Sequence, residues 1–260
     1  MAKELLLAVF AVVLSPSVTA FAAHPLITDD TGTQGKGKTQ LEFTGEYDHD
    51  SDNGLTTNTF IFPRIPVISY GIADTVDLVL GVPYEWRELK QDGIATTERG
   101  ISDLSIQLKW RFQEKDGLSF AVKPGVALPT GDEDKGLGNG KVSYSTFFIT
   151  TKERAPWAFH FNIGYIRNEY KLRTDEAANR KDLWQVSLAS QVEVIKNLKA
   201  VVNIGMERNS DKRSNIGPAF LLGGVIYSIT ESFDLDAGVK TGLNKPETDI
   251  TYLVGVTKRF

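Results

Sequence analysis

Segments in which apolar and polar residues alternate recur along most of this chain. In "ISDLSIQLKWRF", residues 101–112, every second residue from Leu104 onward is apolar, and the residues between are polar or charged. Successive side chains of a strand point to opposite faces, so the pattern predicts a strand with one apolar and one polar face. No helical period separates the segments. We predict twelve strands, at roughly residues 38–48, 56–70, 75–88, 101–113, 118–128, 142–151, 157–168, 182–195, 198–208, 218–228, 232–243 and 248–260.

The connections between these strands alternate between short and long. The short ones are residues 71–74, 114–117, 152–156, 196–197 and 230–232; the long ones are "DHDSDNGL", "LKQDGIATTERG", "PTGDEDKGLGNGK", "NEYKLRTDEAANRK", "NSDKRSNIG" and "NKPET". Outer-membrane barrels combine tight periplasmic turns, longer external loops and an even number of strands. The prediction is therefore an all-β chain: a transmembrane antiparallel up-and-down β-barrel of about twelve strands. A soluble secreted β-sandwich or lipocalin-like barrel is the alternative, and it would bury the apolar faces in a core.

Aromatic residues gather at both ends of the predicted strands. Tyr47, Tyr84, Trp86, Tyr144, Tyr165 and Trp184 fall near the long loops, and Tyr70, Trp110, Phe112, Phe120, Trp157, Tyr227, Phe233 and Phe260 near the short turns. Two such belts are typical of the two interfaces of a membrane. The predicted partners are outer-membrane lipids and lipopolysaccharide. The last strand ends on Phe260, like the C-terminal signal read by the barrel assembly machinery.

The start of the chain has the pattern of a secretory signal peptide. Lys3 is followed by the apolar run Leu5–Leu14 and by a small-residue site ending at Ala22. The run is too short for a membrane-spanning helix. We expect residues 1–22 to be a cleaved signal peptide, 23–37 a periplasmic N-terminal segment, and 38–260 the barrel in the outer membrane of a Gram-negative cell.

Several stretches match motifs of other functional classes, but the residues in or around them do not fit the structure that each motif requires. "GTQGKGKT", residues 32–39, matches the Walker A pattern, yet a strand pattern follows it rather than a helix. The acidic stretch 48–54 resembles a calcium loop, but Asn53 and Thr59 stand where Gly and Glu belong. The chain has no cysteine, three scattered histidines and a net charge of −4. We therefore expect no cofactor, no metal site, no catalytic residues and no nucleic-acid partner.

The polar faces of the predicted strands carry charges of both signs. By parity, the residues that line the interior are Glu42, Glu46, Asp77, Glu85, Asp103, Lys109, Arg111, Lys123, Glu193, Glu207, Asp234, Asp236, Lys240 and Arg259. These charges could form a paired network that fills the interior, or a polar pathway that selects solutes. Twelve strands lie between the filled eight-stranded barrels and the open 16–18-stranded ones, so both roles stay open.

Four phrases resemble the bacterial family named putative MetA-pathway of phenol degradation. They are "HPLITDDTGTQGKGKTQLE" (24–42), "YGIADTVDLVLGVPY" (70–84), "GISDLSIQLKWRF" (100–112) and "LPTGDEDKGLGNGK" (128–141). His24 stands where the family pattern leads us to expect Arg. The resemblance implies a transporter-like outer-membrane barrel associated with small, often aromatic or hydrophobic, compounds, and it brings no set of catalytic residues.

The function we expect is passive passage of small, aromatic or hydrophobic solutes through the barrel. The alternatives are a structural or surface-interaction barrel with a sealed lumen, and a barrel hydrolase. The sequence leaves open the solute, the state of the lumen, the oligomeric state and the facing of strands 56–70, 142–151 and 218–228.

Overall fold

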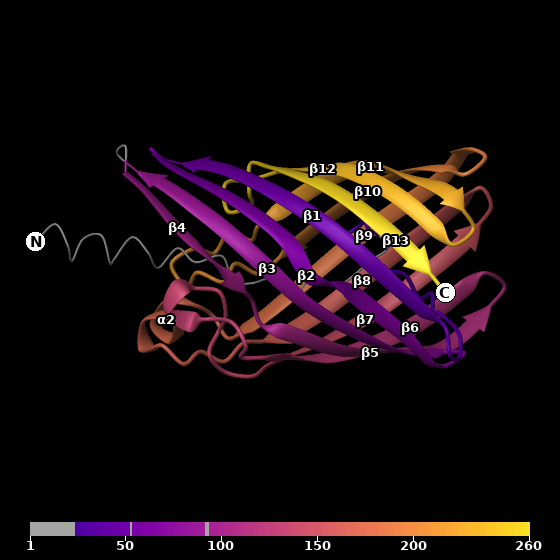
Figure 1. Cartoon of the computed structure of the whole chain (residues 1–260), viewed down its shortest axis with the longest axis horizontal. Helices are drawn as coiled ribbons and strands as arrows, with labels where there is room; N and C mark the ends of the chain where they lie inside the picture. Colours follow the sequence, from indigo (N-terminus) through magenta and orange to yellow (C-terminus); the bar gives the residue numbers. More distant parts are fainter. Residues whose placement is uncertain (1–23, 53, 92–93) are drawn as a thin grey trace, which may run out of the picture.

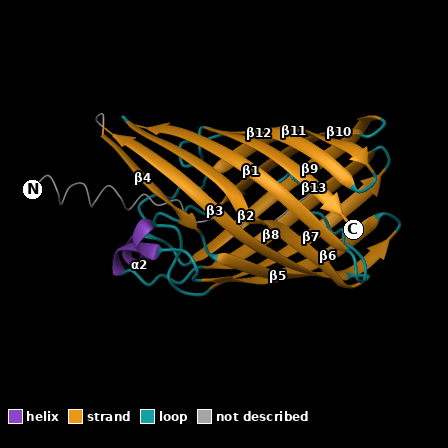
Figure 2. Cartoon of the chain, viewed as in Figure 1, coloured by secondary structure: helices purple, strands orange, loops and turns teal. Residues whose placement is uncertain are grey.

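The computed structural model describes residues 24–52, 54–91 and 94–260. Nearly all of this chain is strand, wound around one axis (Figure 1, Figure 2). The predicted signal peptide, residues 1–22, lies outside the described residues. No helix in the described part is long and apolar enough to cross a membrane.

Thirteen strands form one sheet that closes on itself. Their bounds are β1 Thr39–Asp52, β2 Leu55–Ala73, β3 Val76–Gln91, β4 Ile94–Ile101, β5 Leu104–Lys115, β6 Leu118–Leu128, β7 Ser143–Arg154, β8 Trp157–Arg167, β9 Asp182–Ile195, β10 Leu198–Glu207, β11 Ala219–Thr230, β12 Phe233–Gly242 and β13 Ile250–Arg259. Each strand pairs antiparallel with its neighbour, and β1 pairs with β13 from Gln40↔Arg259 to His49↔Ile250. Closure gives every strand except β4 a partner on both sides, as hydrocarbon surroundings require; β4 pairs with β3 alone.

The wall has twelve strand positions because β4 and β5 share one of them. The first half of β3 pairs with β5, ending at Gly81↔Ser105, and its second half pairs with β4, from Tyr84↔Ile101 onward. This confirms the predicted twelve-stranded antiparallel barrel.

Two of the predicted long loops are strands instead. β1 runs to Asp52 and β2 begins at Leu55, so most of "DHDSDNGL" is paired strand. Likewise, most of "LKQDGIATTERG" forms the end of β3 and the whole of β4. Strands β1–β4 therefore extend past the rest of the barrel at one end (Figure 1). Their residues there are mostly polar, although the ladder of backbone hydrogen bonds continues.

The opposite end has tight turns. Between β5 and β6 the chain reverses at Asp116–Gly117, both with positive φ (52° and 71°). This is the pattern of a two-residue Asp-Gly hairpin turn, whose twist matches that of the flanking strands. β9 and β10 turn at Asn197, which also has positive φ.

The other long connections fold against each other at the end opposite the tight turns. They include the 3-10 turn η1, Glu133–Lys135, and the short helix α2, Arg173–Ala178. Arg180 donates to the carbonyl of Asn209 at 3.0 Å, and Lys171 pairs with Glu133. These loops are therefore linked to one another by polar contacts.

Alternation of burial along the strands shows which residues face outward. Along β8, exposed residues such as Phe159 and Ile163 alternate with buried ones such as His160 and Asn162. Many large apolar side chains around the whole wall are between about one-third and two-thirds exposed. An apolar outer surface this continuous is suited to lipid rather than water.

The strands with unclear parity put apolar side chains inside. In β7, Phe147 and Ile149 are fully buried while Phe148 faces outward. In β11, Phe220, Leu222 and Ile226 are buried and face the interior. In β2, Thr59, Val67 and Ser69 are buried and Phe60 and Tyr70 are exposed. The lumen is therefore partly apolar.

Candidate functional site: the barrel lumen

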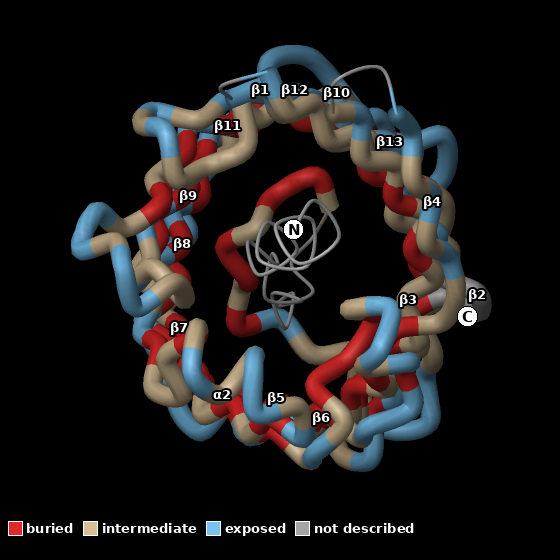
Figure 3. Tube along the Cα trace, turned by 90° about the vertical axis from the view of Figure 1, so that its left-hand side faces the viewer, coloured by how far each residue is buried: buried red, intermediate tan, exposed pale blue. Residues whose placement is uncertain are grey.

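The first described residues of the chain, from His24 to Thr31, lie inside the barrel and are mostly buried. Figure 3 looks along the barrel and shows this buried segment within the ring of strands. The sequence predicts a periplasmic N-terminal segment at residues 23–37; its described part, from residue 24 onward, makes contacts with the lumen wall. We call residues 24–37 the lumenal segment.

Two asparagines of the wall hold the backbone of the lumenal segment. The side-chain oxygen of Asn203 accepts from the N–H groups of Ile27 (2.8 Å) and Thr28 (2.9 Å). Asn162 accepts from the N–H of Asp29 at 2.7 Å and donates to its carbonyl at 2.8 Å. Both asparagines are fully buried, so these contacts satisfy groups that would otherwise be costly to bury.

Asp29 is the electrostatic centre of the lumenal segment. Its carboxylate pairs with Lys109 of β5 at 2.9 Å and with Lys123 of β6. All three side chains are at most 9% exposed. Neighbouring Asp30 lies 3.5 Å from Lys109. Burial alone would raise the pKa of Asp30, but the positive charge of Lys109 and the proximity of His160 outweigh it and lower the pKa to about 2.

Glycines of the wall make room for the two ends of the segment. A Cβ on Gly238 of β12 would lie 3.0 Å from Pro25, so the ring fits because that position has no side chain. At the other end, Gly37 donates to the carbonyl of Gly71 at 2.8 Å, and Gly71 donates to the carbonyl of Lys38 at 2.9 Å. His24 pairs with Asp236 of β12. The lumenal segment is thus held against the barrel wall at both of its ends.

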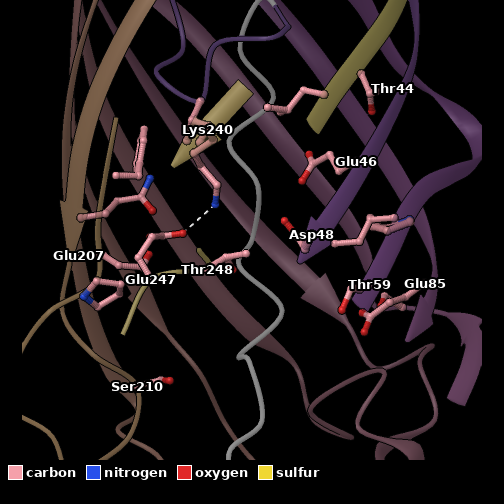
Figure 4. Close-up of a pocket in the computed structure, with 18 of the residues that line it drawn as sticks. Thr44, Glu46, Asp48, Thr59, Glu85, Glu207, Ser210, Lys240, Glu247 and Thr248 are labelled. Atoms are coloured by element: carbon pink, nitrogen blue, oxygen red, sulfur yellow. Dashed lines mark hydrogen bonds and ion pairs between the residues drawn. The ribbon is translucent and has the colours of Figure 1, made fainter. Parts of the chain in front are cut away.

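Beside the lumenal segment, the lumen contains a cavity of about 300 Å³. Ile27 contributes to its lining, and strands from around the whole barrel form its walls. Its apolar lining includes Ile61, Val67, Phe220 and Leu253. Figure 4 shows the polar side, where side chains from β1, β3, β10 and β12 and from the β12–β13 loop point inward.

Carboxylates outnumber cationic groups around this cavity. The acidic lining residues are Glu46, Asp48, Glu85, Asp103, Glu207 and Glu247, and the basic ones are Arg87 and Lys240. Arg87 pairs with Glu85, and Lys240 pairs with Glu247 at 2.7 Å (Figure 4). Asp103 accepts backbone N–H groups from Gly131 and Asn139, each at 3.0 Å. Four of the six carboxylates, on Glu46, Asp48, Asp103 and Glu207, form no ion pair among the described residues, and Asp48 accepts a hydrogen bond from the hydroxyl of Thr251.

The sequence from residue 28 to the last residue, 260, matches the model of one protein family, described as "Putative MetA-pathway of phenol degradation". The chain belongs to this family. The resemblance carried by the four sequence phrases is thereby confirmed. No curated protein matches the chain in sequence.

Solved structures with this fold are outer-membrane barrels. An outer-membrane channel from Pseudomonas putida F1 superposes with a TM-score of 0.70 at 14% identity, covering 89% of this chain and 98% of the channel. The NanC porin gives 0.55 at 9% identity, with 84% and 98% covered. The KdgM porin, in complex with disordered oligogalacturonate, gives 0.51 at 10% identity, with 85% and 99% covered. At these identities the likeness concerns the fold alone.

The charged residues predicted to face inward fall into three groups. Those buried at or near the lumenal segment are Glu42, Asp77, Lys109, Lys123, Asp234 and Asp236; those around the cavity are Glu46, Glu85, Asp103, Glu207 and Lys240. The remaining three, Arg111, Glu193 and Arg259, lie toward the tight turns. There Arg259 pairs with Asp234, Arg111 with Glu114 at 2.9 Å, and Glu193 is exposed. Their role in lining a pore stays a prediction.

Sequence reasoning missed the partners that the lumenal segment supplies. Asp29 and Asp30 belong to a stretch that was interpreted as a lead into the barrel, although two inward lysines had no acidic partner nearby on their own strands. Glu247 was missed because it lies in a loop, and Thr59 because its strand alternates poorly. Lys109 has Asp77 opposite it on β3, but Lys123 has no acidic residue opposite it on β7, and a buried charge of this kind needs a partner from elsewhere in the chain.

The histidines of the described chain form no cluster. His160 is buried, and its Nδ1 lies 3.0 Å from the hydroxyl of Thr151, while His24 pairs with Asp236. His49 contacts Asn58 at 2.8 Å. Within the described residues there is no group of three or more His, Asp or Glu side chains arranged to hold a metal ion.

Proposed function

We propose that this protein is an outer-membrane channel for the passive passage of small, apolar or aromatic solutes. The observation that carries the proposal is the cavity of about 300 Å³ inside a closed barrel, with apolar and polar walls. A volume of this size is within the range of small-molecule sites. Family membership and the likeness to a channel from Pseudomonas putida F1 support it.

A sealed structural barrel is the second candidate, and the lumenal segment favours it. A segment fixed by buried ion pairs and asparagine contacts obstructs part of the lumen. The two candidates differ in whether that segment can move aside. A channel needs a residual path or a displaceable segment, whereas a structural barrel needs neither.

Proteoliposome swelling with small sugars, together with conductance in planar bilayers, tests the proposal. We expect slow but measurable solute entry and conductance above that of protein-free membranes. Absence of both in the full-length chain and in a variant lacking the lumenal segment would favour the sealed barrel. Heat-modifiable migration in the same preparations establishes that the barrel is folded.

The proposal includes the cellular setting. A signal peptide ending at Ala22 would direct export, and the two aromatic belts would contact lipid and lipopolysaccharide. The barrel assembly machinery would recognise the last strand, ending at Phe260. Scattered histidines and a charge network engaged in ion pairs support transport rather than hydrolysis.

A further inference from the structure

We propose that the lumenal cavity binds small organic cations, namely an amine or guanidine carried on a compact apolar body. The inference deepens the proposed channel function by naming a class of solute, and it rests on that function only for the passage of the solute, not for its binding. Charge, an unpartnered buried hydroxyl, and an apolar wall with an aromatic ring support it independently.

The charge balance of the cavity favours a cation. Six carboxylates and two cationic groups line it, and both cationic groups are already paired. Glu46 and Asp48 point into the cavity from alternate positions of β1, and Glu207 and Glu247 point into it from β10 and the β12–β13 loop, so side chains that repel one another when charged are gathered in a confined space (Figure 4). Bringing a positive charge between them relieves this repulsion, because carboxylates held away from bulk water need a counter-charge. An anionic solute would increase the repulsion.

A buried hydroxyl in the same wall has no partner. Thr59 of β2 is 2% exposed, and its Oγ1 makes no hydrogen bond within the described part of the chain. In the strand register it lies directly between Asp48 of β1 and Arg87 of β3, and it lines the cavity (Figure 4). Buried polar atoms are nearly always hydrogen-bonded, so an unpartnered one in a cavity wall indicates a position for a ligand group. An ammonium beside Asp48 could donate to this oxygen.

The apolar lining of the cavity suits the apolar part of such a solute. Ile61, Val67, Phe220 and Leu253 line it, and the last three are at most 8% exposed. The ammonium of Lys240 lies 5.8 Å from the centroid of the Phe220 ring, within cation–π range. The ring therefore already faces a cation in the lumen. A wall of this kind accommodates a phenyl or short alkyl group while the charge points toward Glu46, Asp48 and Glu207.

Titration calorimetry on the full mature protein in detergent tests the inference with benzylamine, benzoate and benzyl alcohol, which share one ring. We expect benzylamine to bind at least about tenfold more tightly than the other two. The double variant Glu46→Gln/Glu207→Gln should lose at least about tenfold in benzylamine affinity. Thr59→Val should weaken it without changing any charge. The matched control is Glu231→Gln, in the exposed turn between β11 and β12, and it should bind as the wild type does.

Binding and passage are separated by a second measurement. Heat-modifiable migration first establishes that each variant is folded. Equal affinity for the three probes, or undiminished benzylamine binding in the folded double variant, would overturn the inference even if proteoliposomes admit arabinose. If benzylamine binds selectively but arabinose and benzylamine both stay outside the vesicles, the cation site stands and the channel function fails.

Discussion

At the scale of single residues, Asp29 is the position on which the closed lumen most depends. Asp29→Asn would leave Lys123 buried without its ion-pair partner and Lys109 with only the more distant Asp30, and losing one partner of a buried pair costs about 3–5 kcal/mol. We expect the lumenal segment to leave its place and conductance in planar bilayers to rise. The control is Asp30→Asn: that side chain is one-third exposed and lies farther from Lys109, so the change should be small. Equal conductance in both variants would contradict this role for Asp29.

Neighbouring Asp30 should keep its negative charge in moderate acid. Because the pKa of Asp30 is lowered to about 2, its contribution to stability is complete above its usual value near 3.8 and is lost as the pH falls toward 2. Conductance recorded from pH 7 down to pH 2 should therefore show no step from this group above about pH 4. Any step between pH 4 and pH 2 that Asp30→Asn removes should be small, because the substitution and protonation remove the same charge. A step above pH 5 that disappears in this variant would show that the assignment is wrong.

Parity identified many inward side chains from sequence but did not reveal what they contact. Lys109 and Lys123 were correctly placed on inward faces, because a strand alternates strictly wherever one side meets lipid. Their partner, Asp29, lies about 80 residues or more away along the chain, and no local pattern encodes such a contact. Phe147 and Ile149 violate the rule of polar interiors. Phe147 packs within the barrel, and its ring centroid is 5.9 Å from the Lys123 ammonium.

At the scale of elements, the sequence predicted twelve strand positions and missed β4. Ile94–Ile101 lacks the apolar alternation that identifies lipid-facing strands, because β4 belongs to the part of the sheet that extends beyond the other strands. Backbone pairing with β3 stabilises it without an apolar face. Apolar residues alternate in a strand only where one of its faces contacts lipid or a core. A strand with both faces in water lacks this pattern, and its sequence therefore resembles that of a loop.

The contact between Pro25 of the lumenal segment and Gly238 of β12 can be tested with one substitution. Gly238→Val would place side-chain atoms against Pro25, and we expect the segment to be displaced and the conductance to rise. Gly223→Val in β11 is the matched control, because a Cβ there meets nothing within 4 Å. Both are non-terminal strand positions at which no positive φ is recorded, so a β-branched residue suits the backbone. Similar conductance in the two variants would show that close packing of Pro25 against Gly238 does not hold the lumenal segment in place.

At the scale of the whole molecule, the closure of the sheet into a barrel can be predicted from the physical properties of a lipid bilayer more directly than from any sequence motif. An apolar outer face requires lipid, and lipid forbids an open sheet edge, so an even set of alternating strands had to form a ring. The strand pattern does not reveal what fills the interior of the barrel. A lumen can be filled by wall side chains, by water or by another part of the chain, and all three are compatible with the same strand pattern.

The end of the last strand allows assembly to be separated from stability. Phe260 is 68% exposed, and its backbone pairs with Thr39 in both directions, at 2.9 Å and 3.3 Å. Phe260→Ala keeps those hydrogen bonds, so the urea midpoint of protein refolded in micelles should hardly change. If the barrel assembly machinery reads this residue, the heat-modifiable fraction recovered from outer membranes should fall several-fold. Tyr227→Ala is the control, since that aromatic is also about half exposed but lies in β11. An equal loss in both variants would assign the effect to the lipid-facing aromatic belt, because only recognition of the last strand depends on position 260.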